Sequence, residues 1–587
     1  MSSELRRARN RQMVIFLLVC AAIVFLLGRL YYWQILQSNS GYRLAQQASD
    51  EHISSEIVNA PRGLIFDAEG HLLATNVVRD DVYIEPIQFA TDHPDNYQAD
   101  VVLQAHKLHE VLSNVSEDQL VKDFYANLAA VRVAGPIEPA QSAQLRKLQL
   151  PDIFLEPRTW RHYPAGDLAA QVLGYVREAD DGHGTQGVYG IEYKYNKLLA
   201  GKPGSFTAET DLSGNPLTVG SSSGQSPVNG ADLTLTIDSD IQYKVQSGLV
   251  DTVKQAGAQS GTAVVINVHT GAIVAMAGAP TFDPNQYGDY AGQKGCIGSE
   301  EVYINPALYC SYEPGSTMKA ITMAAALDQK LITPDTTIND PGYLDFSDGT
   351  PRVTNWRDKG YGQETMTQVL QHSANVGAAY VAYHYLKPQG LYPYLERFGF
   401  GKPTGVLEPE DAGGYRTDTS SGWTMSDLTR QSFGQSITVT PLQLAMAYQA
   451  IANGGVMMQP YIVASVNDNG HVQTTQPHVQ RRVISADTAK TLAGMLSQVA
   501  TFNAITIPGY STAIKTGTAT TQGLEDDQTE ASVAGFVPAS QPQFVILVKL
   551  DRPTHNIYGG TAAGPLWQAI AQQLMWHYAV TPDQPVA

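Results

Sequence analysis

The longest apolar run of the chain lies close to its N-terminus. No charged residue occurs from Met13 to Gly28, and after Arg29 the run continues to Leu36. A helix of this length can cross a bilayer. Four arginines lie between residues 6 and 11, and basic residues on that side predict a cytoplasmic N-terminus. Because no small-x-small cleavage site follows the run, we expect an uncleaved anchor and not a signal peptide.

Residues 37–230 alternate between several patterns. Polar residues with scattered apolar positions predict a juxtamembrane helix at 37–56. Residues 61–74 predict a hairpin with its turn at 67–70, and residues 97–150 have few breakers and an amphipathic pattern typical of helices. The stretch 215–230 is rich in Gly, Ser and Pro, which predicts a flexible connector and a domain boundary.

The remainder predicts strands at both ends and helices between them. Apolar and polar residues alternate at 231–238, and the apolar strands 262–268 and 272–277 flank a short turn. Further strands are expected from Ala513 onward, and a helix at 567–578. This order predicts an α+β fold in which helices cover both faces of a sheet. The polar stretch 521–530 predicts a surface loop.

An Ala-, Met- and Leu-rich stretch after Pro314 and Gly315 predicts a helix with Ser316 in its first turn. Lys319 lies three residues on, so both side chains fall on one face. A serine hydroxyl is a poor nucleophile, but a partly neutral lysine amine can take its proton, and burial or nearby cations favour that neutral form. The helix N-terminus favours a developing oxyanion. Alone, this pair favours the simpler interpretation of a helix N-cap beside a surface lysine.

Two further motifs follow in order, Ser373-Ala374-Asn375 and Lys515-Thr516-Gly517-Thr518. The succession Ser-x-x-Lys, Ser-x-Asn, Lys-Thr-Gly is the known signature of penicillin-binding proteins and class A β-lactamases. Segments 60–74, 157–176 and 187–204 also resemble, in order, the pedestal of class B penicillin-binding proteins. The resemblance to class B covers nearly all of residues 60–575.

That resemblance implies a fold and a domain order. The expected fold is a penicillin-recognising serine transpeptidase domain, with a mainly antiparallel five-stranded sheet covered by helices and a helical subdomain, preceded by an elongated pedestal and a transmembrane helix. The domains are a cytoplasmic tail at 1–12, the transmembrane helix at 13–36, the pedestal at 37–228, the transpeptidase domain at 229–580 and a tail at 581–587.

The resemblance also implies roles for the motif residues. Ser316 would attack the carbonyl between the terminal D-alanines of a stem peptide, and Lys319 would accept its proton. Ser373 would shuttle protons, and Asn375 would bind Lys319 and the substrate amide. Lys515 and Thr518 would bind the substrate's terminal carboxylate. The substrate-binding strand comprises Thr516, Gly517 and Thr518, and the backbone N–H groups of Ser316 and Thr518 would form an oxyanion hole.

The implied activity is a D,D-transpeptidase that cross-links peptidoglycan, binds β-lactams covalently, and needs no metal or cofactor. The alternatives are a D,D-carboxypeptidase or β-lactamase, in which water resolves the acyl-enzyme, and a non-catalytic β-lactam sensor or scaffold. A single-pass protein of the cytoplasmic membrane is expected, with its catalytic domain outside and a multi-span lipid-II-polymerising glycosyltransferase as partner. Division and elongation roles both remain open. The net charge of -18 argues against nucleic-acid binding.

Several other residues carry expectations of their own. Cys296 and Cys310 are close in sequence and expected outside the cytoplasm, which leaves a disulfide and two reduced thiols equally open. His372 is expected to pack and not to catalyse, and Trp356 to pack in the core rather than line a substrate groove. Arg161 and Glu192 are expected to form a structural ion pair or a solvated face, and Arg62 to be exposed on its hairpin.

Overall fold

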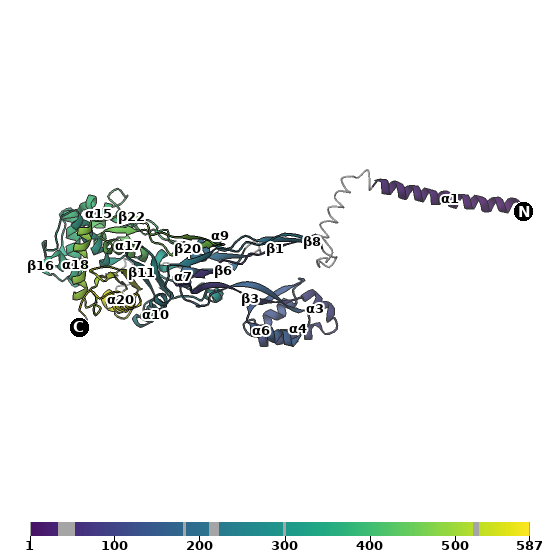
Figure 1. The fold of residues 1–587 in the computed structure, drawn as a ribbon, viewed down its shortest axis with the longest axis horizontal. Coiled ribbons are helices and arrows are strands. Elements are labelled where there is room, and N and C mark those ends of the chain that lie inside the picture. The colour runs from purple at the N-terminus through teal and green to yellow at the C-terminus, as the bar shows by residue number, and fades with distance from the viewer. Residues whose placement is uncertain are drawn as a thin grey trace. The chain divides into compact units, whose positions relative to one another are not determined.

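The computed structural model describes residues 2–32, 53–179, 184–209, 222–297, 301–520 and 528–585. The chain forms two compact units, Met1–Ala60 with Lys202–Val228, and Pro61–Gly201 with Asn229–Ala587 (Figure 1). In the first unit, α1 (Ser2–Tyr31) contains a segment, Arg9–Tyr31, that is long and apolar enough to cross a membrane. This helix fits a single-pass anchor.

The first unit also holds a three-stranded antiparallel sheet in the order β1-β8-β9. Its strands are Ile53–Val58, Gly204–Glu209 and Ser222–Gln225. The predicted juxtamembrane helix at 37–56 lies outside the described residues up to position 52, and its last residues belong to β1, so a helix there is wrong. Residues 215–221 of the predicted connector also lie outside the described residues, and its next four residues form β9.

The second unit begins with the hairpin of β2 (Ile65–Phe66) and β3 (Leu72–Ile84), as predicted. Asp67 fixes its turn by accepting from the backbone N–H groups of Glu69 and His71 at 2.9 and 2.8 Å. β3 also pairs with two later strands. The elements that surround it are α3 (Pro86–Asp92), α4 (Tyr97–Val111), α5 (Glu117–Phe124), β4 (Val131–Ile137), α6 (Pro139–Leu148) and β5 (Ile153–His162).

The prediction of helices throughout 97–150 is therefore partly wrong. Helices α4, α5 and α6 are present, but β4 interrupts them. It pairs with β3, about fifty residues earlier in the chain, a long-range contact that local periodicity does not report. Leu108, Phe124 and Leu145 of these helices are buried against the sheet.

A buried ion cluster joins the start of the β2–β3 hairpin to the end of β5 and to residue 192. Glu192 is fully buried and accepts from the guanidinium groups of Arg62 at 2.6 Å and Arg161 at 2.7 Å. Burial alone would raise the pKa of Glu192, but the two guanidinium groups hold it below its ordinary value. The structural ion pair is confirmed. The exposed position expected for Arg62 is wrong, because only 5% of this residue is exposed.

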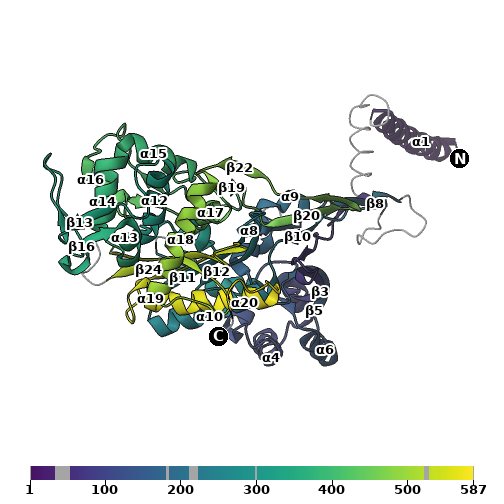
Figure 2. The same cartoon turned by 60° about the vertical axis from the view of Figure 1, so that its left-hand side comes forward.

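The centre of the second unit is a five-stranded antiparallel sheet in the order β12-β11-β25-β24-β23. Helices α10 and α20 cover one face, and α12 and α17 lie over the other (Figure 2). This arrangement confirms the predicted sheet covered by helices. The strands are β11 (Ser260–Asn267), β12 (Ile273–Ala279), β23 (Ala513–Thr520), β24 (Thr529–Val537) and β25 (Phe544–Asp551). The helices are α10 (Ser239–Ala256), α12 (Lys319–Asp328), α17 (Pro441–Ala452), α18 (Ala486–Phe502) and α20 (Gly564–His577).

The predicted loop at 521–530 needs one correction. Residues 521–527 lie outside the described residues, but Thr529 and Glu530 begin β24 and are buried. Alternation does not identify this strand start because its residues are buried on both faces of the covered sheet.

The helical subdomain lies between α12 and α17 in the sequence. It contains α13 (Met366–His372), α14 (Asn375–Tyr380), α15 (Lys387–Arg397) and α16 (Met425–Gln431). A two-stranded ribbon of β13 (Thr337–Asp340) and β16 (Gly362–Thr365) precedes α13. The subdomain was predicted, and the short turn between α13 and α14 carries the second sequence motif.

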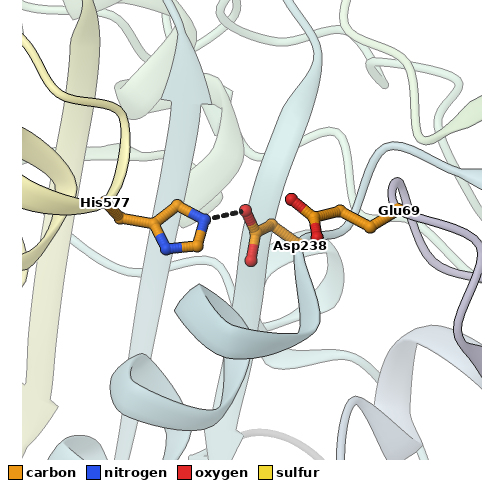
Figure 3. A group of neighbouring side chains, drawn as sticks. All are labelled: Glu69, Asp238 and His577. Atoms are coloured by element: carbon orange, nitrogen blue, oxygen red, sulfur yellow. Dashed lines mark hydrogen bonds and ion pairs between the residues drawn. The ribbon is translucent and has the colours of Figure 1, made fainter.

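The side chains of Glu69, Asp238 and His577 come together at the end of α20 (Figure 3). Asp238 accepts from His577 at 2.7 Å and from the Tyr578 hydroxyl at 2.8 Å through one oxygen. Its other oxygen caps the N-terminus of α10. Both oxygens of Asp238 are thus used by protein donors, and the group ties α20 to α10.

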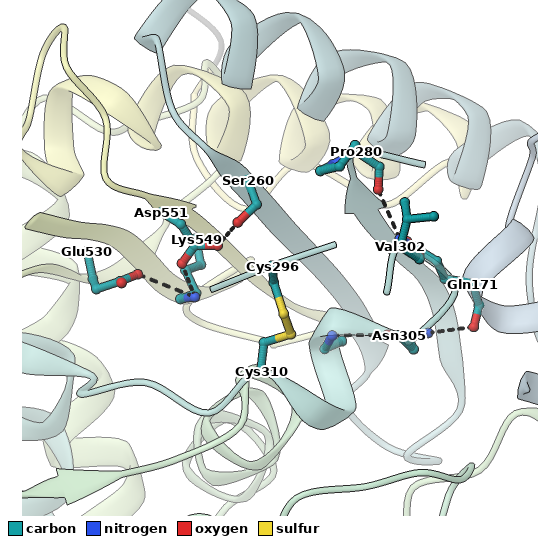
Figure 4. The surroundings of a disulfide bond; sticks show 11 residues. Gln171, Ser260, Pro280, Cys296, Val302, Asn305, Cys310, Glu530, Lys549 and Asp551 are labelled. Atoms are coloured by element: carbon teal, nitrogen blue, oxygen red, sulfur yellow. Dashed lines mark hydrogen bonds and ion pairs between the residues drawn. A yellow bond between two sulfur atoms is a disulfide. The ribbon is translucent and has the colours of Figure 1, made fainter. Parts of the chain in front are cut away.

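A disulfide joins Cys296 and Cys310, with 6.3 Å between their Cα atoms (Figure 4). The question left open by the sequence is therefore resolved in favour of the bond. Nearby, Gln171 donates to the carbonyl oxygens of Pro280 and Val302 at 3.0 and 2.9 Å. These contacts attach the disulfide-bonded segment to the preceding part of the chain.

Candidate active site

The segment before α12 forms a tight turn that presents Ser316. A 3₁₀ turn, η3 (Gly315–Met318), runs directly into α12, which confirms that Ser316 lies at the start of a helix. Gly315 adopts φ +56°, and a Cβ there would lie 3.0 Å from that of Ala519 on β23. A glycine therefore allows the turn to pack closely against the edge strand of the sheet. Ser316 itself is partly exposed.

Lys319 is fully buried and lies at the centre of a hydrogen-bonded cluster. Its Nζ is 2.9 Å from Ser316 Oγ and 2.7 Å from Asn375 Oδ1, and it also bonds the carbonyl oxygen of Ser373. Burial and then the positive charge of Lys515 lower the pKa of Lys319 well below its ordinary value. A neutral amine at this position can accept the proton of the Ser316 hydroxyl.

The second motif occupies the turn between α13 and α14. Ser373 adopts a left-handed backbone conformation, φ +57°, which is uncommon for a residue with a side chain. Its hydroxyl lies between the two lysines, 3.4 Å from Nζ of Lys319 and 3.0 Å from Nζ of Lys515. Asn375 donates to the carbonyl oxygen of Thr354 at 3.2 Å. The turn therefore connects the amine of the first motif to that of the third.

The third motif lies on β23, the edge strand next to η3. Lys515 is fully buried, and burial lowers its pKa to about 7. A Cβ on Gly517 would come within 2.5 Å of Ser532 Oγ and 3.0 Å of the Pro314 carbonyl oxygen, so only glycine fits here without displacement. The Thr518 hydroxyl accepts from the backbone N–H of Gly559 at 3.1 Å.

Five predicted catalytic residues thus meet in one cluster: Ser316, Lys319, Ser373, Asn375 and Lys515. The three predicted substrate-binding residues, Thr516, Gly517 and Thr518, follow Lys515 on the same strand. The resemblance to the family with this motif signature implied this grouping, and in the structure each motif lies at the end or edge of an element.

Sequence reasoning missed three buried polar residues beside the cluster: Asp340, Asn355 and Glu364. The signal for the first was present in β13, where buried and exposed positions alternate and Asp340 shares the buried phase of Ile338. An acidic residue on the buried face of a strand indicates a side chain that is paired inside the protein and not solvated at the surface.

His372 and Trp356 lie beside the cluster. His372 packs as predicted, with its ring stacked on Tyr361 at 4.4 Å between centroids. The core position expected for Trp356 is wrong, since 57% of the residue is exposed and its ring meets that of Tyr558 at 5.1 Å. The groove-lining alternative for Trp356 stays a prediction.

Comparisons with known proteins agree with this geometry. The family "Penicillin binding protein transpeptidase domain" matches residues 261–575, and "Penicillin-binding Protein dimerisation domain" matches 57–235. Stage V sporulation protein D of Bacillus subtilis is 30% identical over 97% of this chain and 86% of its own length. Peptidoglycan D,D-transpeptidase FtsI of Escherichia coli K12 is 29% identical over 97% and 92%.

A solved structure shows the same likeness in three dimensions. Penicillin-binding protein 3 of Mycobacterium tuberculosis, in complex with aztreonam, superposes with a TM-score of 0.65 at 28% identity, covering 91% of this chain and 99% of that one. A transpeptidase domain preceded by a dimerisation domain is the arrangement that the sequence predicted. The chain belongs to the class B penicillin-binding proteins.

Proposed function

We propose that this protein cross-links peptidoglycan as a serine-type D,D-transpeptidase, and that β-lactams inhibit it by acylating Ser316. The observation that carries the proposal is the buried amine of Lys319, 2.9 Å from Ser316 Oγ and beside a second buried lysine. The E. coli relative is named a peptidoglycan D,D-transpeptidase. The catalytic activity is assigned to residues 229–580, following a pedestal at 37–228.

The acylation step uses the first two motifs. Lys319 takes the proton of the Ser316 hydroxyl as Oγ attacks the carbonyl carbon between the terminal D-alanines. The backbone N–H groups of Ser316 and Thr518 stabilise the oxyanion. As the ester to Ser316 forms, the bond to the terminal D-alanine nitrogen breaks, and that nitrogen receives a proton through Ser373, which lies between the two lysines.

Deacylation returns the enzyme to its starting state. An amine of a neighbouring stem peptide loses a proton to the Lys319–Ser373 pair and attacks the ester carbonyl, which forms the cross-link and releases Ser316 Oγ. Lys515 and Thr518 bind the terminal carboxylate of the donor peptide, and Asn375 its amide. Transfer to this amine, and not to water, separates a transpeptidase from a carboxypeptidase or β-lactamase.

Labelled penicillin tests the acylation chemistry. Ser316→Ala should abolish covalent labelling, and Lys319→Ala should nearly abolish it, because the two residues act as a unit. Peptide mapping of the wild-type adduct should place the label on Ser316. A label on any other residue, or labelling of Ser316→Ala, would contradict the mechanism.

The proposal extends to the membrane. α1 would anchor the protein with its N-terminus in the cytoplasm, and the anchor and pedestal would bind a multi-span glycosyltransferase that polymerises lipid II. The support is the arginine cluster before the apolar run and the absence of a polymerase motif in the sequence. In spheroplasts, protease should reach a tag at Ala587 but not one placed before Met13. Co-purification of the partner should be lost when residues 1–204 are deleted.

A further inference from the structure

Two buried acids lie beneath the second motif, and the proposed mechanism uses neither. Asp340 is fully buried and Glu364 is 2% exposed. In the β13–β16 ribbon, Asp340 pairs with Gly362 and Glu364 pairs with Ile338. Both carboxyl groups therefore stand on one face of the ribbon, at diagonal positions that are within reach of each other.

Glu364 holds the residue before Ser373. Its Oε2 lies 2.9 Å from Nδ1 of His372, the last residue of α13. Burial, and then the positive charge of Lys359, lower the pKa of His372, so the ring is neutral and can donate from Nδ1. Stacking on Tyr361 fixes the plane of the ring. Since Glu364 lies just before α13 begins, this bond ties the two ends of the helix together.

Asp340 holds the residue after Asn375. Its Oδ2 accepts from Nδ2 of Asn355 at 2.6 Å, and Oδ1 of Asn355 accepts from the backbone N–H of Val376 at 3.0 Å. The second Asp340 oxygen accepts from the N–H of Gly342 at 2.7 Å. Both flanks of the turn are thus fixed, which allows Ser373 to keep its left-handed backbone conformation.

The two acids also interact with each other. The ribbon register places the two carboxyl groups within reach of each other, and among the described residues Oε1 of Glu364 has no nitrogen or hydroxyl donor. Two carboxyl groups can hydrogen-bond only when a proton lies between them. Burial, and next the charge of Asp340, raise the pKa of Glu364 to about 8, which fits a protonated Glu364 that donates to Asp340.

We propose that Asp340 and Glu364 are positioning residues, which clamp the Ser373–Asn375 turn from both sides and share one proton, so that Lys319 faces one negative charge and not two. This inference rests on the proposed function, since the catalytic base it acts on is Lys319. Both acids act electrostatically on that lysine, in the direction opposite to Lys515.

Ionisation of Glu364 changes the fraction of Lys319 that is neutral, and the charges of the two groups give the direction of the change. The groups that face the pair are His372, Tyr361, Lys319 and, beside His372, Lys359. As pH rises through about 8, Glu364 loses its proton and adds a negative charge near Lys319. That charge stabilises the ammonium form of Lys319 and so lowers the fraction of free amine that can act as base.

Glu364→Gln tests this inference, because a glutamine can accept from His372 and donate to Asp340 but cannot ionise. Second-order rates of penicillin acylation are measured for the full chain in detergent between about pH 6.5 and pH 9.5. At pH 7 we expect the variant to stay within about threefold of wild type, and its rate relative to wild type to rise by about three- to tenfold in the alkaline range.

Two more variants complete the design. Glu364→Ala removes both hydrogen bonds and should slow acylation by about tenfold at pH 7, with a cooperative thermal transition that confirms folding. Because alanine cannot ionise either, its rate relative to wild type should rise in the alkaline range as for Glu364→Gln. Glu396→Gln is the matched control, since Glu396 is exposed and paired with Lys402 at 2.8 Å. Its rate relative to wild type should not change with pH. A pH-independent ratio for Glu364→Gln, or full activity of Glu364→Ala, would overturn the inference.

Infrared spectroscopy provides a readout that needs no acylation. The difference spectrum between the unacylated wild type and Glu364→Gln should contain a protonated-carboxyl band at neutral pH that disappears in the alkaline range; the subtraction removes the bands of other buried acids such as Glu530. Loss of acylation in wild type with this band present would contradict the proposed function alone. Absence of the band from the difference spectrum would overturn the shared proton.

Discussion

Lys515 and Lys549 lie on the same face of the five-stranded sheet and are almost completely buried, yet their surroundings give them opposite properties. Lys515 pairs with Ala534, which pairs with Leu547, so these three side chains lie on one face of the sheet. Lys549 is two residues after Leu547 on β25 and therefore points to the same face. Within the described part of the chain, Lys515 bonds the Ser373 hydroxyl and the Thr516 carbonyl oxygen, both of them neutral, and burial lowers its pKa to about 7. Burial acts on Lys549 too, but the charges of Asp551 and Glu530 outweigh it and raise its pKa above the ordinary value.

The difference shows what a buried lysine needs in order to be chemically useful. Lys549 forms ion pairs with Asp551 and, at 3.3 Å, with Glu530, so it stays charged and cannot accept a proton. Among the described residues, no carboxylate forms such a direct ion pair with Lys319 or Lys515, and Lys515 further depresses the pKa of Lys319. The protein keeps the two catalytic amines apart from direct carboxylate partners and accepts the cost of their burial.

Lys549→Met should produce the largest change in stability. It leaves the carboxyl groups of Asp551 and Glu530 buried without a cation, and removing one partner of a buried pair costs about 3–5 kcal/mol. Chemical denaturation measures this loss. Acylation per folded molecule should change little. Lys549→Met combined with Asp551→Asn is the control and should recover part of the stability; an additive loss in that double variant would contradict the ion-pair explanation.

Lys515→Met should show the reverse pattern. It removes a buried amine for which the described residues provide no counter-ion, so stability should be unchanged or higher. Acylation should fall by about two to three powers of ten, the usual cost of losing one preorganised electrostatic contact in an active site. Fluorescent-penicillin kinetics and thermal unfolding measure the two effects. If Lys515→Met lost stability as Lys549→Met does, the contrast between the two lysines would be wrong.

The pedestal supplies a smaller test of the paired state. Glu192→Gln should lower stability at neutral pH by roughly 1–3 kcal/mol, because Arg62 and Arg161 then lack a carboxylate. Folding lowers the pKa of Glu192 from 4.5. The contribution of Glu192 to the free energy of unfolding is therefore present above the pKa of the unfolded chain and is lost as the pH falls through the pKa of the folded protein. The difference from wild type should therefore shrink in acid. A constant difference from about pH 6 to pH 3 would contradict this assignment.

The sequence predicted the catalytic cluster better than its supports. Ser316, Lys319 and Ser373 belong to short motifs that match a known signature, and the resemblance to that family implied their grouping. Asp340 and Glu364 meet through ribbon pairing, and Asn355 reaches the backbone of Val376 from a separate segment. Such contacts depend on tertiary register, which no single stretch of residues encodes.

The fold was predictable to a similar degree. The covered sheet followed from the order of strand and helix patterns, and the β2–β3 hairpin from its turn residues. β4 was missed because its strand partner is distant in the sequence. Trp356 was misplaced because hydrophobicity alone does not distinguish a buried aromatic from one exposed beside a site.

The sheet that begins with β2 and β3 has a consequence for biosynthesis. The main path of this sheet has the order β21-β20-β10-β2-β3-β4, in which β10 (Asp232–Leu235) pairs with β2. β20 (Val463–Asp468) and β21 (His471–Thr474) are encoded about 400 residues after β2. At roughly 5–20 residues per second, β20 leaves the ribosome about 20–80 s after β2. β10 is itself made about 170 residues after β2, and from then until β20 appears its edge lacks a neighbour. The sheet therefore cannot be completed until the late part of the chain has been made. If synthesis stops within the helical subdomain, the edge of β10 stays unpaired and can pair with strands of other unfolded chains.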